Sequence, residues 1–388
     1  MPTREGRELD ISTSNSWIEI SESALANNVA VFRKMAGDGR HLMAVVKSNA
    51  YGHGMIEVAQ ISLSAGADWL GVFSPEEGFA LRRNGIDAPI LVFGPTHEAA
   101  MDDAIRAGMH LTIASHSAAA AIARRPVAAE ARVHLKIETG TNRQGMVAGE
   151  LEGAIRVLSK AKVRIEGAYT HFADIEDTTE HAFAEKQKVR FAEVLAQLAA
   201  DGVKLEIPHA ACTAAAILFP ETHHALVRMG IGLYGLWPSK ETRVSANALG
   251  RNKIGFMPVM TWKTRISQIK AVTAGDYIGY GRTFRATRST LLAVVPVGYA
   301  DGYDRSLSNS AHTIVRGVRA PVLGRICMNM MMIDVSDVPS PAEGDEVVLL
   351  GSQGDESVTA EDLARFASTI NYEIVARAAP YAPRIVVA

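Results

Sequence analysis

The pattern of apolar and polar positions divides the chain into two parts. From Leu42 to about Gly235, short apolar runs alternate with amphipathic or alanine-rich stretches. The predicted strands begin near Leu42, Trp69, Pro89, His110, Val133, Val163, Leu205 and Leu226. Strands that alternate with helices are typical of βα units in a parallel sheet, and eight of them fit a closed (β/α)8 barrel of the TIM type.

One helix of this region has a clear start and end. Ser74 is followed by Pro75 and then by Glu77, the order of an N-cap, a first-turn proline and a capping-box glutamate. Gly85 is the stop signal. We therefore expect a helix that begins after Ser74 and ends before Gly85.

Past Trp237 the alternation ceases, and the polar segment to about Leu249 is expected to be a linker. The remaining apolar segments are separated by Gly, Asp and Pro turns, which predicts a mainly-β domain, a sandwich or small barrel. Its expected strands cover 259–272, 277–280, 291–297, 312–318, 330–335 and 346–350, with one late helix near 361–370.

The predicted fold class is therefore α/β, an N-terminal (β/α)8 barrel followed by a C-terminal mainly-β domain. Trp17 to Ile20 reads as a further short strand. We expect residues 1–20 to pack with the β domain, 21–240 to form the barrel and 241–388 to form the β domain.

Composition narrows the class of partner. The chain has 388 residues, of which 48% are hydrophobic, and a formal net charge of −2 without a long basic run, which argues against nucleic acid. Its two cysteines, Cys212 and Cys327, suggest a reducing compartment rather than a disulfide framework. No apolar stretch is long enough for a membrane span, and the N-terminus lacks a signal-peptide core. We expect a cytoplasmic protein that acts on a small molecule.

The strongest candidate for chemistry follows the first barrel strand. The apolar run from Leu42 to Val46 stops at Lys47, and a polar loop containing Gly52 and Gly54 comes next. A lysine after a strand is more often a solvated loop residue, but catalytic groups of barrels lie at these strand ends. Apolar surroundings lower the pKa of an amine and make it a nucleophile. Schiff-base chemistry at Lys47 is the first hypothesis.

Polar groups also follow later strands. Arg143 is expected at the same rim, where its guanidinium would suit a carboxylate or phenolate oxygen, although arginines are commonly exposed. His171 is expected there in a supporting role, because a lone histidine is more often structural. Arg228 stands between Val227 and Met229 and would be costly to bury without an acceptor, such as a pyridine nitrogen.

Two further motifs complete the candidates. Loops after barrel strands 7 and 8 commonly bind phosphate, which selects Thr213, Gly230 and Ile231. In the β domain, Tyr280 lies between two glycines, which would free the backbone to present its phenol. An aromatic residue at a β-turn is the alternative reading of that tyrosine.

The segment VVKSNAYGHG around Lys47 resembles the cofactor-lysine segment of the pyridoxal-phosphate-dependent alanine racemases. The other motifs match that family in the same order, from Trp17 to Arg384. The resemblance implies pyridoxal 5'-phosphate as cofactor, no metal, and two-base interconversion of L- and D-alanine that supplies D-alanine for cell-wall peptidoglycan. Lys47 would bind the cofactor and act as one base, and Tyr280 would be the other.

The resemblance also implies roles for the remaining candidates. Arg143 would contact the cofactor phenolic oxygen and the substrate carboxylate, and Lys136 matches a carbamylated lysine that orients that arginine. Arg228 would donate to the pyridine nitrogen, and the backbone at Met328 would contact the substrate carboxylate. The remaining expected cofactor-binding residues are Tyr51, His171, Thr213, Gly230, Ile231 and Tyr381.

Three positions depart from the family pattern. Cys212-Thr213 replaces Asn-Ser but keeps a hydroxyl, and Asn329 replaces an aspartate near the substrate, which could alter substrate preference. Pro380 stands where the family has a phosphate-binding tyrosine, with Tyr381 one residue later.

Other readings remain open at this point. The substrate could be serine or a broader set of amino acids. A barrel-type decarboxylase would use a proton donor such as Cys327, and a non-catalytic cofactor-binding barrel would need no β domain. The resemblance further implies a head-to-tail homodimer with shared active sites, in which Tyr280 acts on the cofactor of the partner chain.

Overall fold

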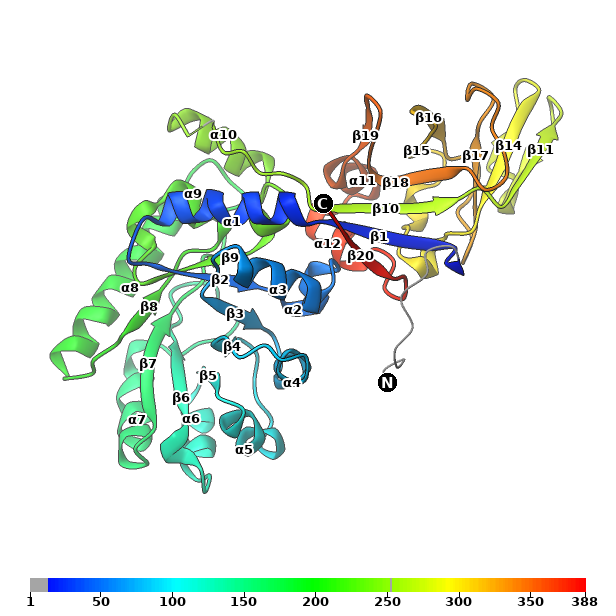
Figure 1. The fold of residues 1–388 in the computed structure, drawn as a ribbon. Coiled ribbons are helices and arrows are strands. Elements are labelled where there is room, and N and C mark those ends of the chain that lie inside the picture. The colour runs from blue at the N-terminus through cyan, green and yellow to red at the C-terminus, as the bar shows by residue number, and fades with distance from the viewer. Residues whose placement is uncertain (1–12, 252) are drawn as a thin grey trace. The chain divides into compact units, whose positions relative to one another are not determined.

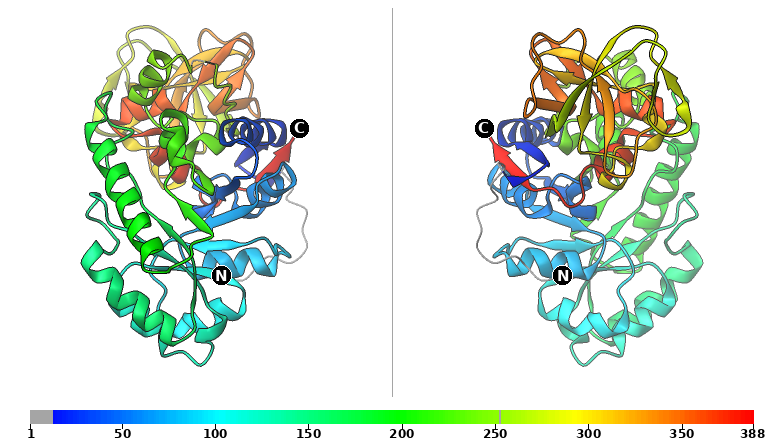
Figure 2. Two further views of the ribbon diagram at one scale, coloured as in Figure 1. Left: turned by 90° about the vertical axis from the view of Figure 1, so that its left-hand side faces the viewer. Right: turned by 90° about the vertical axis from the view of Figure 1, so that its right-hand side faces the viewer.

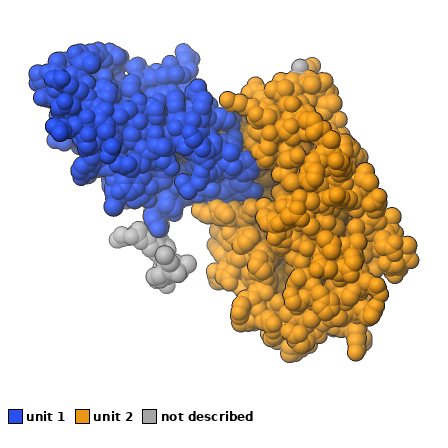
Figure 3. All heavy atoms as spheres, turned by 180° about the vertical axis from the view of Figure 1, so that it is seen from behind, with its two compact units in different colours: residues 1–23, 51–54, 258–388 blue, residues 24–50, 55–257 orange. Residues whose placement is uncertain are grey.

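The computed structural model describes residues 13–251 and 253–388, which divide into two compact units (Figure 3). The described part of what is here called the first unit, orange and labelled unit 2 in Figure 3, comprises 24–50, 55–251 and 253–257. That of the second, blue and labelled unit 1 in Figure 3, comprises 13–23, 51–54 and 258–388. Within these ranges, no helix combines the length and the apolar character that a bilayer crossing requires.

The first unit is built on eight parallel strands (Figure 1). Pairing runs in the order β9-β2-β3-β4-β5-β6-β7-β8. The strands are β2 (His41–Val45), β3 (Trp69–Val72), β4 (Ile90–Val92), β5 (Met109–Ile113), β6 (Arg132–Lys136), β7 (Arg164–Tyr169), β8 (Ile207–His209) and β9 (Leu226–Met229). Between β8 and β9, the Ala225 amide donates to the Pro208 carbonyl (3.1 Å). The predicted eight-stranded barrel, nearly closed, is confirmed.

Helices flank this sheet (Figure 2). They are α1 (Glu22–Ala36), α2 (Lys47–Tyr51), α3 (Met55–Ser64), α4 (Pro75–Arg83), α5 (Glu98–Arg106), α6 (His116–Ala123), α7 (Ala148–Lys160), α8 (Ala182–Ala200), α9 (Thr213–Leu218) and α10 (Lys240–Ala248). Short 3₁₀ turns are η2 (Ala128–Glu130), η3 (Pro220–Thr222) and η4 (Ile231–Tyr234). The strands are almost wholly buried, since helices cover one face and side chains fill the interior.

Helix α4 has the predicted start and end, but its capping differs from the prediction. Pro75 occupies the first turn, and Gly85 adopts a positive φ of 74° after the last turn. The Ser74 side chain makes no capping hydrogen bond. Glu77 instead accepts the amides of Phe73 (2.7 Å) and Ser48 (2.7 Å), so the expected capping-box glutamate holds the loop after β2.

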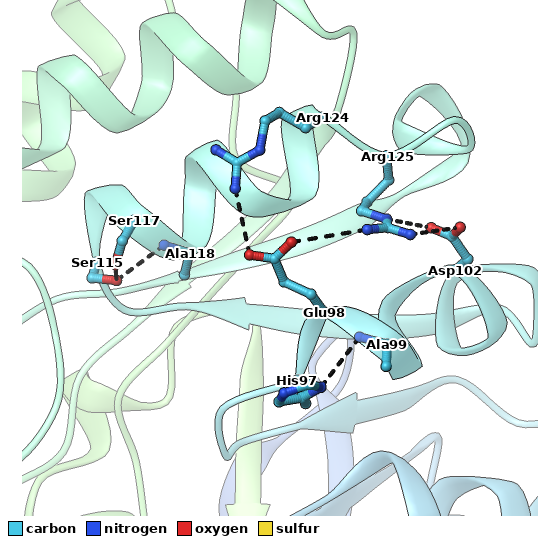
Figure 4. Close-up of polar contacts among 9 residues, drawn as sticks. All are labelled: His97, Glu98, Ala99, Asp102, Ser115, Ser117, Ala118, Arg124 and Arg125. Atoms are coloured by element: carbon cyan, nitrogen blue, oxygen red, sulfur yellow. Dashed lines mark hydrogen bonds and ion pairs between the residues drawn. The ribbon is translucent and has the colours of Figure 1, made fainter.

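Side-chain contacts join α5 and α6 on the outside of the barrel (Figure 4). Ser115 caps α6 by accepting the Ala118 amide (3.1 Å). Arg125, just past α6, forms two hydrogen bonds to the Asp102 carboxylate of α5 (2.7 and 3.0 Å), with Glu98 as a further partner. A bidentate arginine–carboxylate pair has a defined geometry and therefore fixes how neighbouring helices meet.

The prediction of a linker past Trp237 is wrong, because this segment forms helix α10. Ser239 is its N-cap and accepts the Thr242 amide (2.9 Å), and the helix buries Thr242, Ser245 and Ala246. Polarity alone suggested an irregular linker, but three buried small residues on one side are sufficient to dock a largely polar helix.

The second unit is mainly β. A seven-stranded sheet has the order β16-β15-β18-β10-β1-β20 with β19 beside β18, and a three-stranded sheet has the order β11-β14-β17. The first contains β1 (Ser16–Ser21), β10 (Met260–Arg265), β15 (His312–Val315), β16 (Val318–Pro321), β18 (Glu346–Gln353), β19 (Glu356–Val358) and β20 (Arg384–Val387). The second contains β11 (Gln268–Val272), β14 (Thr290–Val295) and β17 (Met331–Asp334), and β12 (Tyr277–Ile278) pairs with β13 (Phe284–Arg285).

Several details of this unit differ from the sequence-based prediction. The expected strand 259–272 is two strands in different sheets, because the Ile266 amide bonds to Asp345 and the Ser267 amide bonds to Val294. The single late helix is a pair, α11 (Ala360–Ala367) and α12 (Asn371–Arg377), and β20 was not anticipated. Strand β1 lies between β10 and β20, antiparallel to the first and parallel to the second. Three further 3₁₀ turns are η5 (Tyr280–Arg282), η6 (Tyr299–Asp301) and η7 (Arg305–Leu307).

Candidate active site

Lys47 begins a left-handed turn at the end of strand β2. The four residues that follow it have φ values between 52° and 55°. Left-handed conformation costs an L-residue roughly 1–2 kcal/mol, so four in succession need compensating contacts. The Ala50 amide bonds to the Val46 carbonyl (2.8 Å), and the Asn49 side chain accepts the Met55 amide (2.9 Å). Sequence reasoning anticipated the tight loop but not this handedness.

The surroundings of Lys47 disfavour its charged form. Burial is the largest cause that lowers the pKa of its amine, and the positive charge of Arg143 lowers it further. Glu77 opposes both effects, since its carboxylate lies close to the turn through its bond to the Ser48 amide. A larger fraction of the amine is therefore unprotonated near neutral pH than in a solvated lysine.

The structure brings Lys47 together with four other sequence candidates. Burial lowers the pKa of His171 well below its usual value, and the next causes are the positive charges of Arg228, Lys136, Arg143 and Lys47. These groups come from the C-terminal ends of four strands or from the loops that follow them. Such a concentration of cations around one neutral imidazole suits a ligand that carries phosphate, phenolate and carboxylate oxygens.

Arg228 is buried on strand β9, with 5% of its surface exposed. Its Nη2 donates to the carbonyls of Thr170 (3.0 Å) and Ala210 (2.8 Å), and its Nη1 lies 2.8 Å from Nδ1 of His209. Three acceptors therefore fix the orientation of the guanidinium. Because arginine does not lose its proton in proteins, Arg228 can only donate to a neighbouring ring nitrogen.

Lys136 is buried at the end of β6. Burial, followed by the charge of Arg228, lowers the pKa of its amine to about 7. Its Nζ lies 4.9 Å from the centre of the Tyr169 ring, a cation–π distance. A lysine with this pKa is partly unprotonated at neutral pH, which is the form that reacts with carbon dioxide.

Three backbone and side-chain groups lie close together after β8 and β9. The buried Thr213 hydroxyl is 3.2 Å from the amide nitrogens of both Gly230 and Gly232. A Cβ at Gly232 would lie 2.7 Å from Thr213 Cγ2, so only glycine fits there. The predicted residue Ile231 begins turn η4 between the two glycines. Because both amides donate to the Thr213 hydroxyl oxygen, the O–H of Thr213 is left to donate to an oxygen of a phosphate group.

Sequence reasoning missed two contributors to this region. Gly232 is one, and its signal was the repeated glycine in the segment Gly230-Ile231-Gly232. Tyr234 is the other, because its buried hydroxyl donates to the Val45 carbonyl (2.7 Å) and ties η4 to the strand that precedes Lys47. No periodic pattern distinguishes this tyrosine from a core aromatic residue.

Tyr280 lies in the second unit, with 71% of its surface exposed. Its neighbours Gly279 and Gly281 have φ values of 75° and 71°, which favour glycine. A Cβ at Gly281 would approach the Arg325 guanidinium to 3.1 Å. The two glycines are thus required by the turn that presents the phenol.

Met328 and Asn329 belong to another turn of the second unit. Gly298 packs so closely on this turn that a Cβ would lie 2.2 Å from the Cys327 carbonyl oxygen. The Asn329 side chain donates to the Asp301 carboxylate (3.2 Å), which also accepts the Gly298 amide (2.9 Å). A carboxylate therefore lies beside Asn329, although residue 329 itself is uncharged.

The remaining two cofactor candidates also belong to the second unit. The ring of Tyr51 is centred 6.2 Å from that of Tyr372, which the sequence analysis did not single out. Tyr381 is 87% exposed. Of the two, Tyr51 has a packed aromatic neighbour, whereas the Tyr381 side chain is largely exposed.

Comparisons with known proteins match both parts of the chain. The N-terminal domain model of alanine racemase matches residues 20–238, and the C-terminal domain model matches 259–386. An alanine racemase of Leptospira interrogans is 39% identical over 375 residues, which is 97% of this chain and 96% of the relative. One of Symbiobacterium thermophilum is 41% identical over 372 residues, 95% of this chain and 96% of the relative.

Solved structures show the same likeness. The alanine racemase of Bacillus anthracis with bound L-Ala-P has a TM-score of 0.89 at 34% identity, covering 96% of this chain and 95% of that one. A histidine racemase of Leuconostoc mesenteroides subsp. sake has a TM-score of 0.87 at 28% identity, covering 97% and 99%. Since both domain models match and the relatives align over nearly their whole length, the chain belongs to the alanine racemase family of pyridoxal-phosphate-dependent isomerases.

Proposed function

We propose that this protein interconverts L-alanine and D-alanine with pyridoxal 5'-phosphate as cofactor. One observation carries the proposal: the positive charges of Lys47, Lys136, Arg143 and Arg228 all lower the pKa of His171 near the C-terminal rim of the barrel, and the pKa of the Lys47 amine is itself lowered. An unprotonated lysine beside fixed cations is what covalent binding of an aldehyde cofactor with a phosphate group requires.

The residues present fit that cofactor. When bound, pyridoxal phosphate makes the α-hydrogen of the attached amino acid acidic. The Thr213 hydroxyl and the amides of Gly230 and Ile231 would hold the phosphate, with Tyr51 as a further donor. We also assign Tyr381 to the phosphate, and this assignment rests only on its position in the sequence. Arg228 would donate to the pyridine nitrogen and leave it unprotonated, which weakens the ring as an electron sink and disfavours transamination.

Two bases would handle the proton on opposite faces of the substrate. The Lys47 Nζ takes or returns it on the face of the D-enantiomer, and the Tyr280 hydroxyl does so on the face of the L-enantiomer. Arg143 orients the substrate carboxylate together with the Met328 backbone. Lys136, with its pKa of about 7, would carry a carbamate whose negative charge orients Arg143.

Assembly and location are part of the same proposal. The protein would be a cytoplasmic, head-to-tail homodimer in which each chain supplies Tyr280 to the cofactor site of the other. Its product would be D-alanine for peptidoglycan. The high exposure of Tyr280 supports sharing, since a catalytic phenol needs a site around it and such a site would come from the partner.

A broader amino-acid specificity is the second candidate, because Asn329 stands where the family has an aspartate and because a histidine racemase shares this fold. A basic-amino-acid decarboxylase and a non-catalytic binding protein are not favoured, since the matched relatives are racemases.

Chiral chromatography on a panel of L-amino acids would test the proposal. D-alanine should form fastest, and a Lys47→Ala protein should form none. If serine or another amino acid is turned over faster, that amino acid and not alanine is the substrate. Release of carbon dioxide without formation of a D-amino acid would contradict racemisation.

A further inference from the structure

A line of buried polar side chains crosses the barrel interior from β5 to β9. Nδ1 of His110 lies 3.0 Å from Oε2 of Glu166, and Nδ1 of His134 lies 3.0 Å from Nε2 of His209. His209 then meets Arg228 through Nδ1 at 2.8 Å. All five residues are at most 7% exposed. Of these residues, only Arg228 is part of the candidate active site. The role of His110, His134 and Glu166 therefore needs a separate explanation.

The positions of the protons follow from Arg228. Its guanidinium can only donate, so Nδ1 of His209 must accept. A neutral His209 then carries its proton on Nε2 and donates it to Nδ1 of His134. His134 in turn carries its proton on Nε2. Neutrality is consistent with burial, the largest cause that lowers the pKa of His134 to about 3 and that of His209 well below its usual value.

The proton on His134 is directed at a cluster of polar atoms. His110, His134 and Glu166 each offer one side-chain nitrogen or oxygen, and these three atoms lie within 4.8 Å of one another. The relevant polar atoms of this cluster are Nε2 of His134, Nδ1 of His110 and Oε2 of Glu166. Each is buried, and none has a well-aligned hydrogen-bond partner among the described residues. The charges facing this point are the Glu166 carboxylate and, beyond it, the Arg164 guanidinium at 3.5 Å from Oε1. An unsatisfied donor on His134 and an unsatisfied acceptor on Glu166 therefore belong to the same buried cluster.

Two histidines and a carboxylate are also a common donor set for zinc. A metal would need the lone pair of His134 Nε2, which moves the proton to Nδ1. His209 would then have to accept at Nε2 and carry its own proton on Nδ1, opposite the N–H of Arg228 at 2.8 Å. Two donors cannot share that short contact, so the hydrogen bonds of this chain oppose a metal in the cluster.

We propose that Glu166 is a positioning residue for Arg228 and acts through His134 and His209. The four residues form a one-directional chain, here termed the buried relay, in which Arg228 donates to His209, His209 to His134, and His134 toward the Glu166 carboxylate. His110 holds that carboxylate from the other side. Aligned hydrogen bonds between a cation and an anion strengthen one another in a low-dielectric interior. The relay thereby fixes the guanidinium that the proposed function places at the pyridine nitrogen, and in that respect it rests on the proposed function.

Neutron diffraction from deuterated crystals of the cofactor-loaded protein near pH 7 tests the proton positions. We expect deuterium on Nε2 of both His134 and His209 and none on Nδ1 of either. Deuterium on Nδ1 of His134 would overturn the relay. This measurement needs no variant and no turnover, so it decides the relay even if the protein racemises no amino acid, an outcome that would refute the proposed function alone.

Metal titration separates the relay from a zinc site. The loaded protein, titrated with Co²⁺ and Zn²⁺ after removal of adventitious metal, should show no tetrahedral Co²⁺ absorbance. One equivalent of bound metal that is lost in a His110→Ala protein would overturn the proposal.

Variants test the positioning role. Glu166→Leu removes the acceptor, and we expect kcat to fall roughly three- to tenfold with KM nearly unchanged, which corresponds to the net contribution of about one hydrogen bond. The visible absorbance of the cofactor should also titrate at a shifted pH. Glu166→Gln, which keeps an oxygen acceptor, should restore most of both properties.

Glu206→Gln is the matched control, because Glu206 binds the same Arg164 (2.8 Å) but does not contact the histidines. It should leave kcat and the absorbance titration unchanged. If a folded Glu166→Leu protein behaves like this control, with the wild-type kcat and absorbance titration, then Glu166 does not position Arg228.

Discussion

The two proposed bases lie in opposite kinds of environment. Lys47 lies at the end of a buried barrel strand, where burial and Arg143 lower the pKa of its amine. Tyr280 lies on a glycine-flanked turn of the mainly-β unit and is 71% exposed. The chain therefore tunes the lysine with its own barrel residues, whereas the surroundings that a catalytic tyrosine needs must come from outside its turn.

Removing Lys47 should have the largest effect. Lys47→Ala should lower kcat by at least roughly 10³-fold and abolish the yellow colour, because both the covalent link and one base are lost. Borohydride reduction of the wild-type protein, followed by peptide mapping, should find the pyridoxyl group on Lys47. Lys160→Ala, at the end of the outer helix α7, is the control and should be fully active. Labelling of Lys136 instead would contradict the assignment.

Tyr280→Phe should lower racemisation by roughly 10²- to 10⁴-fold, the usual contribution of a general acid–base group. Its melting temperature should stay within about 1 °C of wild type, since exposed side chains contribute little to stability. Exchange of the α-hydrogen of D-alanine with solvent should persist, because Lys47 alone serves that face. Tyr277→Phe alters a neighbouring exposed tyrosine and should be neutral. Equal loss of exchange from both enantiomers would argue against two separate bases.

Replacing Arg228 with Glu tests whether this barrel residue keeps the pyridine nitrogen of the cofactor unprotonated. An acidic partner would let the pyridine nitrogen become protonated, so racemisation should fall by about one to two orders of magnitude while a pyruvate-forming side reaction rises. Pyruvate is measured with a coupled dehydrogenase, and the bound cofactor by its long-wavelength absorbance. Arg243→Glu, on helix α10, is a control for added negative charge. Unchanged rates and spectra would mean that Arg228 does not face the ring.

Mixing inactive proteins tests whether Tyr280 serves a partner chain. Lys47→Ala and Tyr280→Ala chains, unfolded and refolded together in equal amounts, should form about half mixed dimers, each with one intact site. Roughly a quarter of wild-type activity should then return, if the two sites work independently. Two folded, dimeric parents whose mixture stays inactive would place Tyr280 in the site of its own chain.

Features that follow from the local sequence pattern could be predicted, whereas those that depend on backbone handedness or on distant contacts could not. Strand ends are visible as the point where an apolar run stops, so the sequence pattern alone predicted that Lys47, Arg143 and His171 lie at one rim of the barrel. The left-handed turn after Lys47 did not, because Ser48 and Asn49 carry no signal that compels a positive φ. Glu77 was assigned to its own helix, whereas it bonds to a loop 29 positions earlier.

Buried polar contacts were the least predictable feature. His110 and Glu166 appear in the sequence as single polar residues within strands and gave no indication that they would meet at 3.0 Å. Helix α12 and strand β20 were missed for the opposite reason, since both are short and only half-buried and are fixed by long-range partners such as β1. The local pattern of apolar residues predicts which positions are buried, but it does not predict which distant residues will be in contact there.

The smallest expected effect concerns Lys136 and the stability of the fold. The pKa of its amine is about 7 in the folded protein against 10.5 for a solvated lysine, so between these values the unfolded chain binds more protons. Stability therefore rises with pH across this window, and below about pH 7 the buried charge imposes its full cost. Lys136→Met removes the charge, so it should raise the melting temperature by a few degrees at pH 6.5, and this gain should shrink toward pH 10. Thermal melts in carbon-dioxide-free buffer measure it, with Lys160→Met as the exposed control. A gain that does not depend on pH would mean that Lys136 is uncharged across the whole range.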